Sequence, residues 1–247
     1  RDIKYIKNGS SGYKKIYIYN KIVVANNSGE ESFYLTKSPY CSSLLEPDTK
    51  SLKNWNFADL FKIERIIKLK TTNLNKVLDE LDIKKIDWFK TDSQGTDLRL
   101  FQNIEPDIIK KILAADFEPG IINAYKGEDK LYSVMAFMDQ LPFWVSDLNL
   151  PRAVRIRKDI QGKVLGKTDQ NAQKFLNLAL KSSPVCGEIS YLNSFKESDY
   201  FSKRDYLLMW IFAYIKNQLA FASEIANQGE ERFKDEAIHV NAEMKNS

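Results

Sequence analysis

The 247-residue sequence predicts an α/β fold with a mainly parallel sheet flanked by helices and a helical C-terminal extension. Three observations predict it. Helical and strand-like segments alternate between residues 72 and 157, an order typical of βαβ units with helices on both faces of a sheet. The short apolar runs of this region end in turn residues, as buried strands do. The last third contains instead a long apolar helix, which begins near residue 202.

The N-terminal part is expected to form strands. Residues 15–19 alternate, residues 22–25 form a short apolar run, and residues 32–36 are rich in β-forming residues. The turn signal Asn-Asn-Ser-Gly occupies residues 26–29. A hairpin-like pair is therefore predicted over residues 22–36, followed by a loop over residues 37–53.

The central part predicts alternating helices and strands. A helix is expected after Thr72 as N-cap, because apolar residues recur there at i, i+3, i+4 and i+7. Strands are expected at residues 86–91, 112–117, 143–149 and 153–157, and further helices at residues 96–104 and 129–141. Ligands of such folds bind beyond the carboxyl ends of the strands. The turn after Ala25, the turn at residues 92–95 and Glu118 are all expected at that edge.

The last third is expected to be mostly helical, with a loop at residues 161–168, a helix at 170–180 and a strand at 186–192. Ser202 and Asp205 have the spacing of a capping box and begin a helix that is expected to reach Asn227, with Gly229 at its end. From Tyr206 to Ile215 this helix is apolar all round and must be covered, either by the protein's own core or by a homodimer contact. We therefore expect an α/β domain over residues 1–160 and a helical extension packed on it over residues 161–247.

Composition excludes several classes of protein. The net charge of +4 is a small excess, and the sequence contains no nucleic-acid-binding motif. Its longest apolar run is much shorter than the roughly 20 residues of a membrane span. The two cysteines, Cys41 and Cys186, lack the spacing of a disulfide framework or a zinc site, so a reducing cytoplasm is the expected location. The single histidine, His239, excludes a Ser/His/Asp triad in practice because it lies in a polar tail.

Residues 72–98 resemble a pattern of the FkbM methyltransferases. Thr-Asn-Leu-Asn at residues 72–75 is similar to that family's Thr-x-Leu-Asp helix start, and Lys-Thr-Asp-Ser-Gln-Gly-Thr-Asp at residues 90–97 to its Lys-Ile-Asp-x-Glu-Gly-x-Glu strand end. Residues 29–35 and 41–44 also resemble the family's strand and serine-containing loop, and residues 201–210 a C-terminal extension of some members. The resemblance implies a Rossmann-like fold and S-adenosylmethionine (SAM) as cofactor.

The sequence departs from the family's pattern at several positions. Thr91, Gln94 and Asp97 replace its isoleucine and its two glutamates, so a strictly acidic role at Gln94 is in doubt. The family's opening strand and glycine-rich loop are absent, and residues 8–12 do not replace them because no apolar strand precedes. Either that segment precedes Arg1, which is the favoured reading, or the chain does not bind the cofactor.

The resemblance also implies roles for individual residues. Asp92 is expected nearest the transferred methyl group and the acceptor, as the base or as an orienting group, although an acid that binds turn N–H groups is the structural alternative. Glu118 is the second candidate, for holding the acceptor. For SAM we expect Ala25 and Asn26 at the adenine. Ser42 is expected either at the amino-acid end of SAM or as a capping group of its own loop. Asp92, Gln94 and Gly95 form the adjoining turn, in which Gly95 either permits a tight backbone path or is a simple turn glycine. No metal is expected, although a magnesium site of Asp92, Asp116 and Glu118 is not excluded.

The leading hypothesis is an O-methyltransferase that transfers a methyl group from SAM to a hydroxyl of a sugar, glycan or other secondary metabolite. The acceptor class comes from the resemblance alone. A second hypothesis is a non-catalytic binding or assembly module with a degenerate methyltransferase fold, which uses the aromatic helix around Trp210 as a partner surface. A polyanion-binding protein is a third, weakly supported reading.

Overall fold

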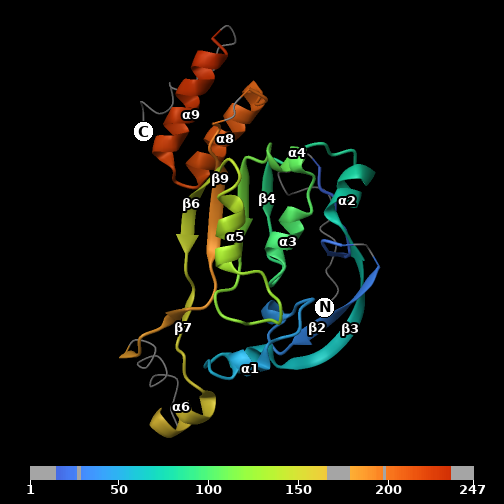
Figure 1. Ribbon diagram of the computed structural model, residues 1–247, viewed down its shortest axis with the longest axis vertical. Coiled ribbons are helices and arrows are strands. Elements are labelled where there is room, and N and C mark those ends of the chain that lie inside the picture. Colours follow the sequence, from blue (N-terminus) through green and yellow to red (C-terminus); the bar gives the residue numbers. More distant parts are fainter. Residues whose placement is uncertain (1–14, 27–28, 166–178, 197–198, 235–247) are drawn as a thin grey trace.

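A four-stranded sheet lies at the centre of the protein, whose computed structural model describes residues 15–26, 29–165, 179–196 and 199–234 (Figure 1). Across the sheet the strands are β4 (Trp88–Lys90), β5 (Ala114–Phe117), β9 (Glu188–Asn193) and β6 (Phe143–Asn149). β4 and β5 are parallel, but β9 is antiparallel to both β5 and β6. The α/β class is therefore confirmed, whereas the expectation of a mainly parallel sheet is not, because the sheet is mixed.

Helices α3 (Asp97–Gln102) and α5 (Leu131–Met138) cover one face of this sheet (Figure 1). Phe89 and Phe117 of the strands pack there against Phe101, whose ring is fully buried with its centroid 5.1 Å and 5.2 Å from theirs. Val134 and Met138 of α5 belong to the same core. Apolar burial of this kind is the main favourable term in folding.

The opposite face packs against α8 (Lys203–Ile215) and α9 (Leu219–Arg232). Trp88 contacts Phe212 of α8 at 5.0 Å between ring centroids, and Trp144 contacts Phe221 of α9 at 5.1 Å. Adjacent residues of β4, Trp88 and Phe89, thus point to opposite faces, as the two-residue period of a strand requires.

A second, three-stranded sheet has the order β1 (Ile22–Val23), β3 (Ile63–Thr72), β2 (Glu30–Thr36). β3 is parallel to β1 and antiparallel to β2, and in Figure 1 it is the long curved strand beside β2. The predicted hairpin over residues 22–36 is therefore wrong, because β3 lies between its two strands. β3 itself was not predicted, since its charged residues face solvent and break the apolar pattern.

The predicted long helix of residues 202–227 is two helices. The capping box at its start is confirmed, with the Asp205 carboxylate accepting the Ser202 N–H at 2.9 Å. The break between α8 and α9 contains Asn217 at φ 58°, a left-handed conformation that asparagine tolerates better than most residues. Gly229 lies inside α9 and not at its end. A Cβ on Gly229 would lie 3.3 Å from the Tyr206 ring.

The remaining elements are short. They are the 3₁₀ helices η1 (Pro39–Cys41) and η2 (Ala58–Phe61), the helices α1 (Thr49–Leu52), α2 (Leu74–Glu80), α4 (Pro106–Ile109) and α6 (Lys158–Leu165), and the strand pair β7 (Arg152–Ala153) and β8 (Ser183–Pro184). Asn73, not Thr72, caps α2, with its side chain accepting the Lys76 N–H at 2.8 Å.

Two more expectations at the level of secondary structure are corrected. Residues 15–19 form no strand and expose Ile16, Tyr17 and Ile18 to solvent, because no neighbouring strand pairs with them in the described part of the chain. Only Ala153 of the strand expected at residues 153–157 is in a strand, β7. The helix expected at residues 170–180 lies mostly outside the described residues, as do residues 8–12 and His239.

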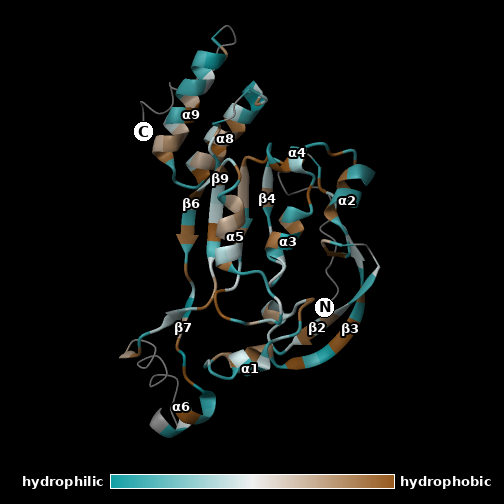
Figure 2. Cartoon of the chain, viewed as in Figure 1, coloured by the Kyte–Doolittle hydropathy of each residue, from teal (hydrophilic) through white to brown (hydrophobic). Residues whose placement is uncertain are grey.

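Hydrophobic residues concentrate where the helices and the central sheet meet, while the C-terminal end of α9 is hydrophilic (Figure 2). No helix in the described ranges combines the length and the apolar character that crossing a bilayer requires.

Candidate functional site

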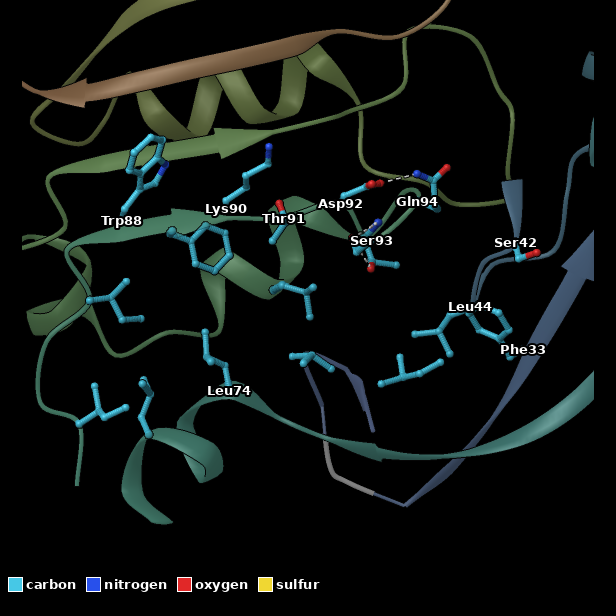
Figure 3. A pocket seen from close by; sticks show the side chains of 18 of the residues that line it. Phe33, Ser42, Leu44, Leu74, Trp88, Lys90, Thr91, Asp92, Ser93 and Gln94 are labelled. Atoms are coloured by element: carbon cyan, nitrogen blue, oxygen red, sulfur yellow. Dashed lines mark hydrogen bonds between the residues drawn. The ribbon is translucent and has the colours of Figure 1, made fainter. Parts of the chain in front are cut away.

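A cavity of about 700 Å³ lies between β4 on one side and β1, β2 and α2 on the other (Figure 3). Within the described residues β4 pairs only with β5, and β1 only with β3, so the facing edges of both strands are free. The volume is within the range of roughly 300–1,000 Å³ that ligand sites have.

The cavity has an apolar part and a polar end. Val23 of β1, Leu74 and Leu78 of α2, and Ile86 and Phe89 line the part beside β4. Beyond the carboxyl end of β4 the lining becomes polar, and Figure 3 shows these side chains in sequence from the strand end towards β2. They are Asp92, Ser93, Gln94 and Ser42.

The turn after β4 has an unusual backbone that fixes the polar end. Gln94 has φ 54° and Gly95 has φ 104°, both in the left-handed region. A Cβ on Gly95 would lie 3.0 Å from Cβ of Glu128 and 3.2 Å from Cδ1 of Leu45, so close packing as well as conformation requires glycine. The expectation that Gly95 permits a tight backbone path agrees with this geometry.

Gln94 binds the Asp92 carboxylate directly. Its Nε2 donates to Asp92 Oδ1 at 2.5 Å, and its Oε1 accepts a hydrogen bond of 3.2 Å from the Tyr125 hydroxyl. Burial raises the pKa of Tyr125, which keeps this hydroxyl a neutral donor. A glutamate at position 94 could not donate to Asp92 and would repel it.

Ser42 lies on the cavity wall but its hydroxyl already has a structural partner. Ser42 Oγ accepts the Thr36 N–H at 3.1 Å and lies 3.4 Å from Thr36 Oγ1, and the residue is 8% exposed. These hydrogen bonds fit the loop-capping role that the sequence left open, and Ser42 also lines the same cavity as Asp92 and Gln94. Ala25 and Asn26 do not line the cavity; Ile22 and Val23 of the same segment do.

Glu118 follows β5 and lines a second cavity, of about 320 Å³. The two cavities have Trp88, Lys90 and Thr91 in common, but Asp92 lines only the first and Glu118 only the second. Burial raises the pKa of Glu118, and the negative charges of Asp92 and Glu188 add to the effect. The two candidate catalytic acids therefore flank the ends of the parallel pair β4 and β5, on the walls of different cavities.

The floor of the second cavity is an ion pair that the sequence did not reveal. Lys216 Nζ, at the end of α8, donates to Asp116 Oδ1 at 2.6 Å and to Ser190 Oγ at 3.0 Å. The same ammonium lies 4.9 Å from the centre of the Trp88 ring, whose Nε1 donates to Asp116 Oδ2 at 2.7 Å. A lysine directly after an apolar helix was the only available signal.

These bonds bear on the magnesium site considered for Asp92, Asp116 and Glu118. Asp116 uses both of its oxygens on protein donors. The residues that the structure describes include no cluster of three or more histidine, cysteine or acidic side chains arranged to hold a metal ion. The structure gives that alternative no support.

Asp97, which sequence reasoning treated only as a replaced glutamate, is 1% exposed and joins the two strand ends. Its carboxylate accepts the Ser93 N–H at 3.0 Å and the Glu118 N–H at 2.7 Å. An acid in the first turn of a predicted helix is ordinarily a capping group, so the sequence alone gave no reason to single it out.

Comparison with known proteins supplies one match. The family model of the methyltransferase FkbM domain matches residues 8–143, which is more than half of the chain and includes the first cavity, Asp92 and Glu118. No curated protein and no solved structure matches the chain.

Proposed function

Because this chain belongs to the FkbM methyltransferase family, we propose that it transfers a methyl group from SAM to a hydroxyl of a sugar, glycan or other secondary metabolite. The observation that carries the proposal is the position of Asp92. Its carboxylate follows β4 at the polar end of a ligand-sized cavity and is bound by Gln94. In the proposed reaction this carboxylate binds the acceptor hydroxyl.

The residues present fit SAM in charge, because the exposed carboxylate of Asp92 at the polar end of the cavity suits a cationic ligand. Bound SAM supplies a methyl group already activated by a sulfonium. We propose that Ser42, Gln94 and Gly95 surround its amino-acid end, and that Ala25 and Asn26, after β1, approach the adenine.

The protein's own task is then positioning and proton removal. Asp92 orients the acceptor hydroxyl and accepts its proton, and the Nε2 donor of Gln94 holds the carboxylate in place. Glu118, on the wall of the neighbouring cavity, holds a second polar group of the acceptor. No metal is included in this proposal.

The free edge of β4 supports a further part of the proposal. The apolar part of the cavity runs beside this edge, and strand edges of this kind are templates for pairing with another strand. We propose that the opening strand expected from the family pairs here and that its glycine-rich loop reaches the polar end. This arrangement would complete the cofactor site without displacing Asp92.

Calorimetry and a transfer assay test the function. We expect the protein, together with any residues that precede Arg1 in the natural polypeptide, to bind SAM. Asp92→Ala should lower kcat by about 10²–10⁴-fold, the usual contribution of a positioned acid or base. Asp92→Asn separates the two roles, because an amide oxygen can orient a hydroxyl but cannot take its proton. The control Asp107→Ala changes an exposed acid of α4. Wild-type turnover in Asp92→Ala would remove Asp92 from the mechanism.

One observation favours the assembly module as second candidate. The outer face of α8 leaves Ile211, Tyr214 and Ile215 39%, 54% and 62% exposed, so this helix is not covered all round. We propose a homodimer contact there; light scattering of Tyr214→Lys against wild type tests it, and equal monomeric masses would oppose it.

A cytoplasmic location remains a proposal, based on the free thiols of Cys41 and Cys186.

A further inference from the structure

Asp97 connects the two strand ends that carry the candidate catalytic acids. Its Oδ1 accepts hydrogen bonds from the backbone N–H of Ser93, at 3.0 Å, and from the Ser93 hydroxyl. Its Oδ2 accepts the backbone N–H of Glu118 at 2.7 Å. Ser93 directly follows Asp92, so one carboxylate holds the backbone beside Asp92 and the backbone of Glu118.

These contacts differ from those of a simple helix cap. Asp97 is the first residue of α3, where an acid ordinarily interacts with the free N–H groups of its own helix. The N–H groups that Asp97 binds belong to the turn after β4 and to the end of β5. Charge-assisted hydrogen bonds of a carboxylate 1% exposed are strong and directional, so they fix both partners.

We propose that Asp97 is a positioning residue that sets the Asp92 and Glu118 carboxylates relative to each other across the ends of β4 and β5. The inference rests on the proposed methyl transfer, in which these two acids bind the acceptor. Asp97 lines neither cavity and so acts only through Ser93 and Glu118.

The charge of Asp97 supports the link to Glu118. Burial is the largest cause of the raised pKa of Glu118, followed by the charges of Asp92, Glu188 and Asp97, with Lys90 acting in the opposite direction. The other charged groups of the same cavity are Asp147 on β6 and the Asp116–Lys216 pair. Replacing Asp97 by a neutral residue therefore moves the pKa of Glu118 downward.

The test is Asp97→Asn, which keeps the shape of the side chain, with Asp107→Asn as a matched control in the first turn of the exposed helix α4. Carboxyl and amide NMR of Glu118 are recorded against pH. In Asp97→Asn we expect a lower titration midpoint for Glu118 and an upfield shift of its amide proton. In the transfer assay kcat should fall about 10–100-fold with a much smaller change in KM for SAM, the effect of misplacing reacting groups by an ångström or less.

The readouts separate the possible failures. A Glu118 midpoint and amide shift equal to those of wild type and of the control would overturn the inference. If no protein, wild type included, transfers a methyl group, the proposed function fails while the NMR result still decides the link between Asp97 and Glu118. If Asp97→Asn does not fold, Ser93→Ala serves instead: it removes one donor to Oδ1, together with the acceptor of the Thr96 N–H, but keeps the charge, so kcat should fall while the Glu118 midpoint stays near wild type. Unchanged kcat in that variant would count against positioning.

Discussion

The buried pair of Lys216 and Asp116 ties α8 to the central sheet, and Lys216→Met tests how much it contributes. The two side chains are 11% and 15% exposed, and their 2.6 Å contact joins the end of α8 to the middle of β5. Methionine keeps most of the apolar stem of lysine and removes its charge. The variant therefore leaves the Asp116 carboxylate buried without its cation.

The size of the effect follows from what Asp116 retains. Removing one partner of a buried pair costs about 3–5 kcal/mol, and the lost contact of the ammonium with the Trp88 ring adds about 0.5–2 kcal/mol. In the other direction, Asp116 keeps hydrogen bonds from Trp88 Nε1 and Ser190 Oγ, and the adjoining cavity of about 320 Å³ admits water. We expect a net loss of about 2–4 kcal/mol of unfolding free energy.

Thermal and urea unfolding followed by circular dichroism measure this loss. At 2–4 °C per kcal/mol for a protein of this size, Lys216→Met should melt about 4–16 °C below wild type. The double variant Asp116→Asn/Lys216→Met should be more stable than Lys216→Met alone, because no charge is then left unpaired. Lys111→Met, on the surface, should change stability by less than about 0.5 kcal/mol. A loss below about 1 kcal/mol for Lys216→Met would refute this reasoning.

Three further predictions concern other parts of the protein. Gly95→Ala should destabilise by about 1–3 kcal/mol in urea unfolding, because residue 95 has φ 104° and its new Cβ meets Glu128; an unchanged midpoint would contradict the geometry. Burial and nearby acids raise the pKa of Cys186 to about 11, so alkylation by iodoacetamide, followed by mass spectrometry, should be slow at pH 8 and accelerate up to pH 11. Rapid labelling of Cys186 at pH 7 would contradict the raised pKa of its thiol. Burial alone would raise the pKa of Asp205, but hydrogen bonds from Lys85 and Ser202 to its carboxylate hold this pKa below its usual 3.8. The resulting stabilisation is present above pH 3.8 and is lost as the pH falls through the lowered pKa of Asp205. The unfolding free energy of the wild type should therefore decrease in this acid range, and that of Asp205→Asn should not show this decrease. Identical acid profiles for the two proteins would exclude this role of Asp205.

The elements that the sequence predicted are those in which a local pattern reflects burial. β5 has three buried apolar residues, Ala114, Ala115 and Phe117. α5 places Val134 and Met138 on one buried side. The capping box of Ser202 and Asp205 is likewise local. In each case the interactions that determine the structure lie within a few residues of each other.

What could not be predicted depends on partners distant in the chain. β3 mixes charged residues with isoleucine and leucine without a regular alternation, on a strand that is largely open to solvent, so nothing in its pattern indicated a central position between β1 and β2. The antiparallel direction of β9 is set by pairing with β5 and β6, which no local pattern encodes. The end of α8 had one local signal, Asn217, which was outweighed by the apolar residues on both sides.

In the candidate site, too, the local neighbours could be predicted from the sequence and the contacts between distant residues could not. Asp92 and Gln94 were placed together because a four-residue turn contains both, and Ser42 because a family pattern contained it. The separation of Glu118 into a second cavity and the bridge through Asp97 required the register of β4 against β5. Lys216, 100 residues from Asp116 in sequence, reaches the site only because α8 packs on Trp88.

The position of β9 has a consequence for how the protein is synthesised and how it can be shortened. β5 and β6 are joined by a strand that is made some 40 residues after β6, so the centre of the sheet stays open until the ribosome has passed Asn193. A chain cut at residue 143, where the family match ends, would present β5 with a bare edge and apolar Ala114, Ala115 and Phe117 beside it. Such an edge invites pairing between molecules, and we expect that fragment to precipitate on expression, whereas a chain that retains residues through the end of α9 remains dispersed.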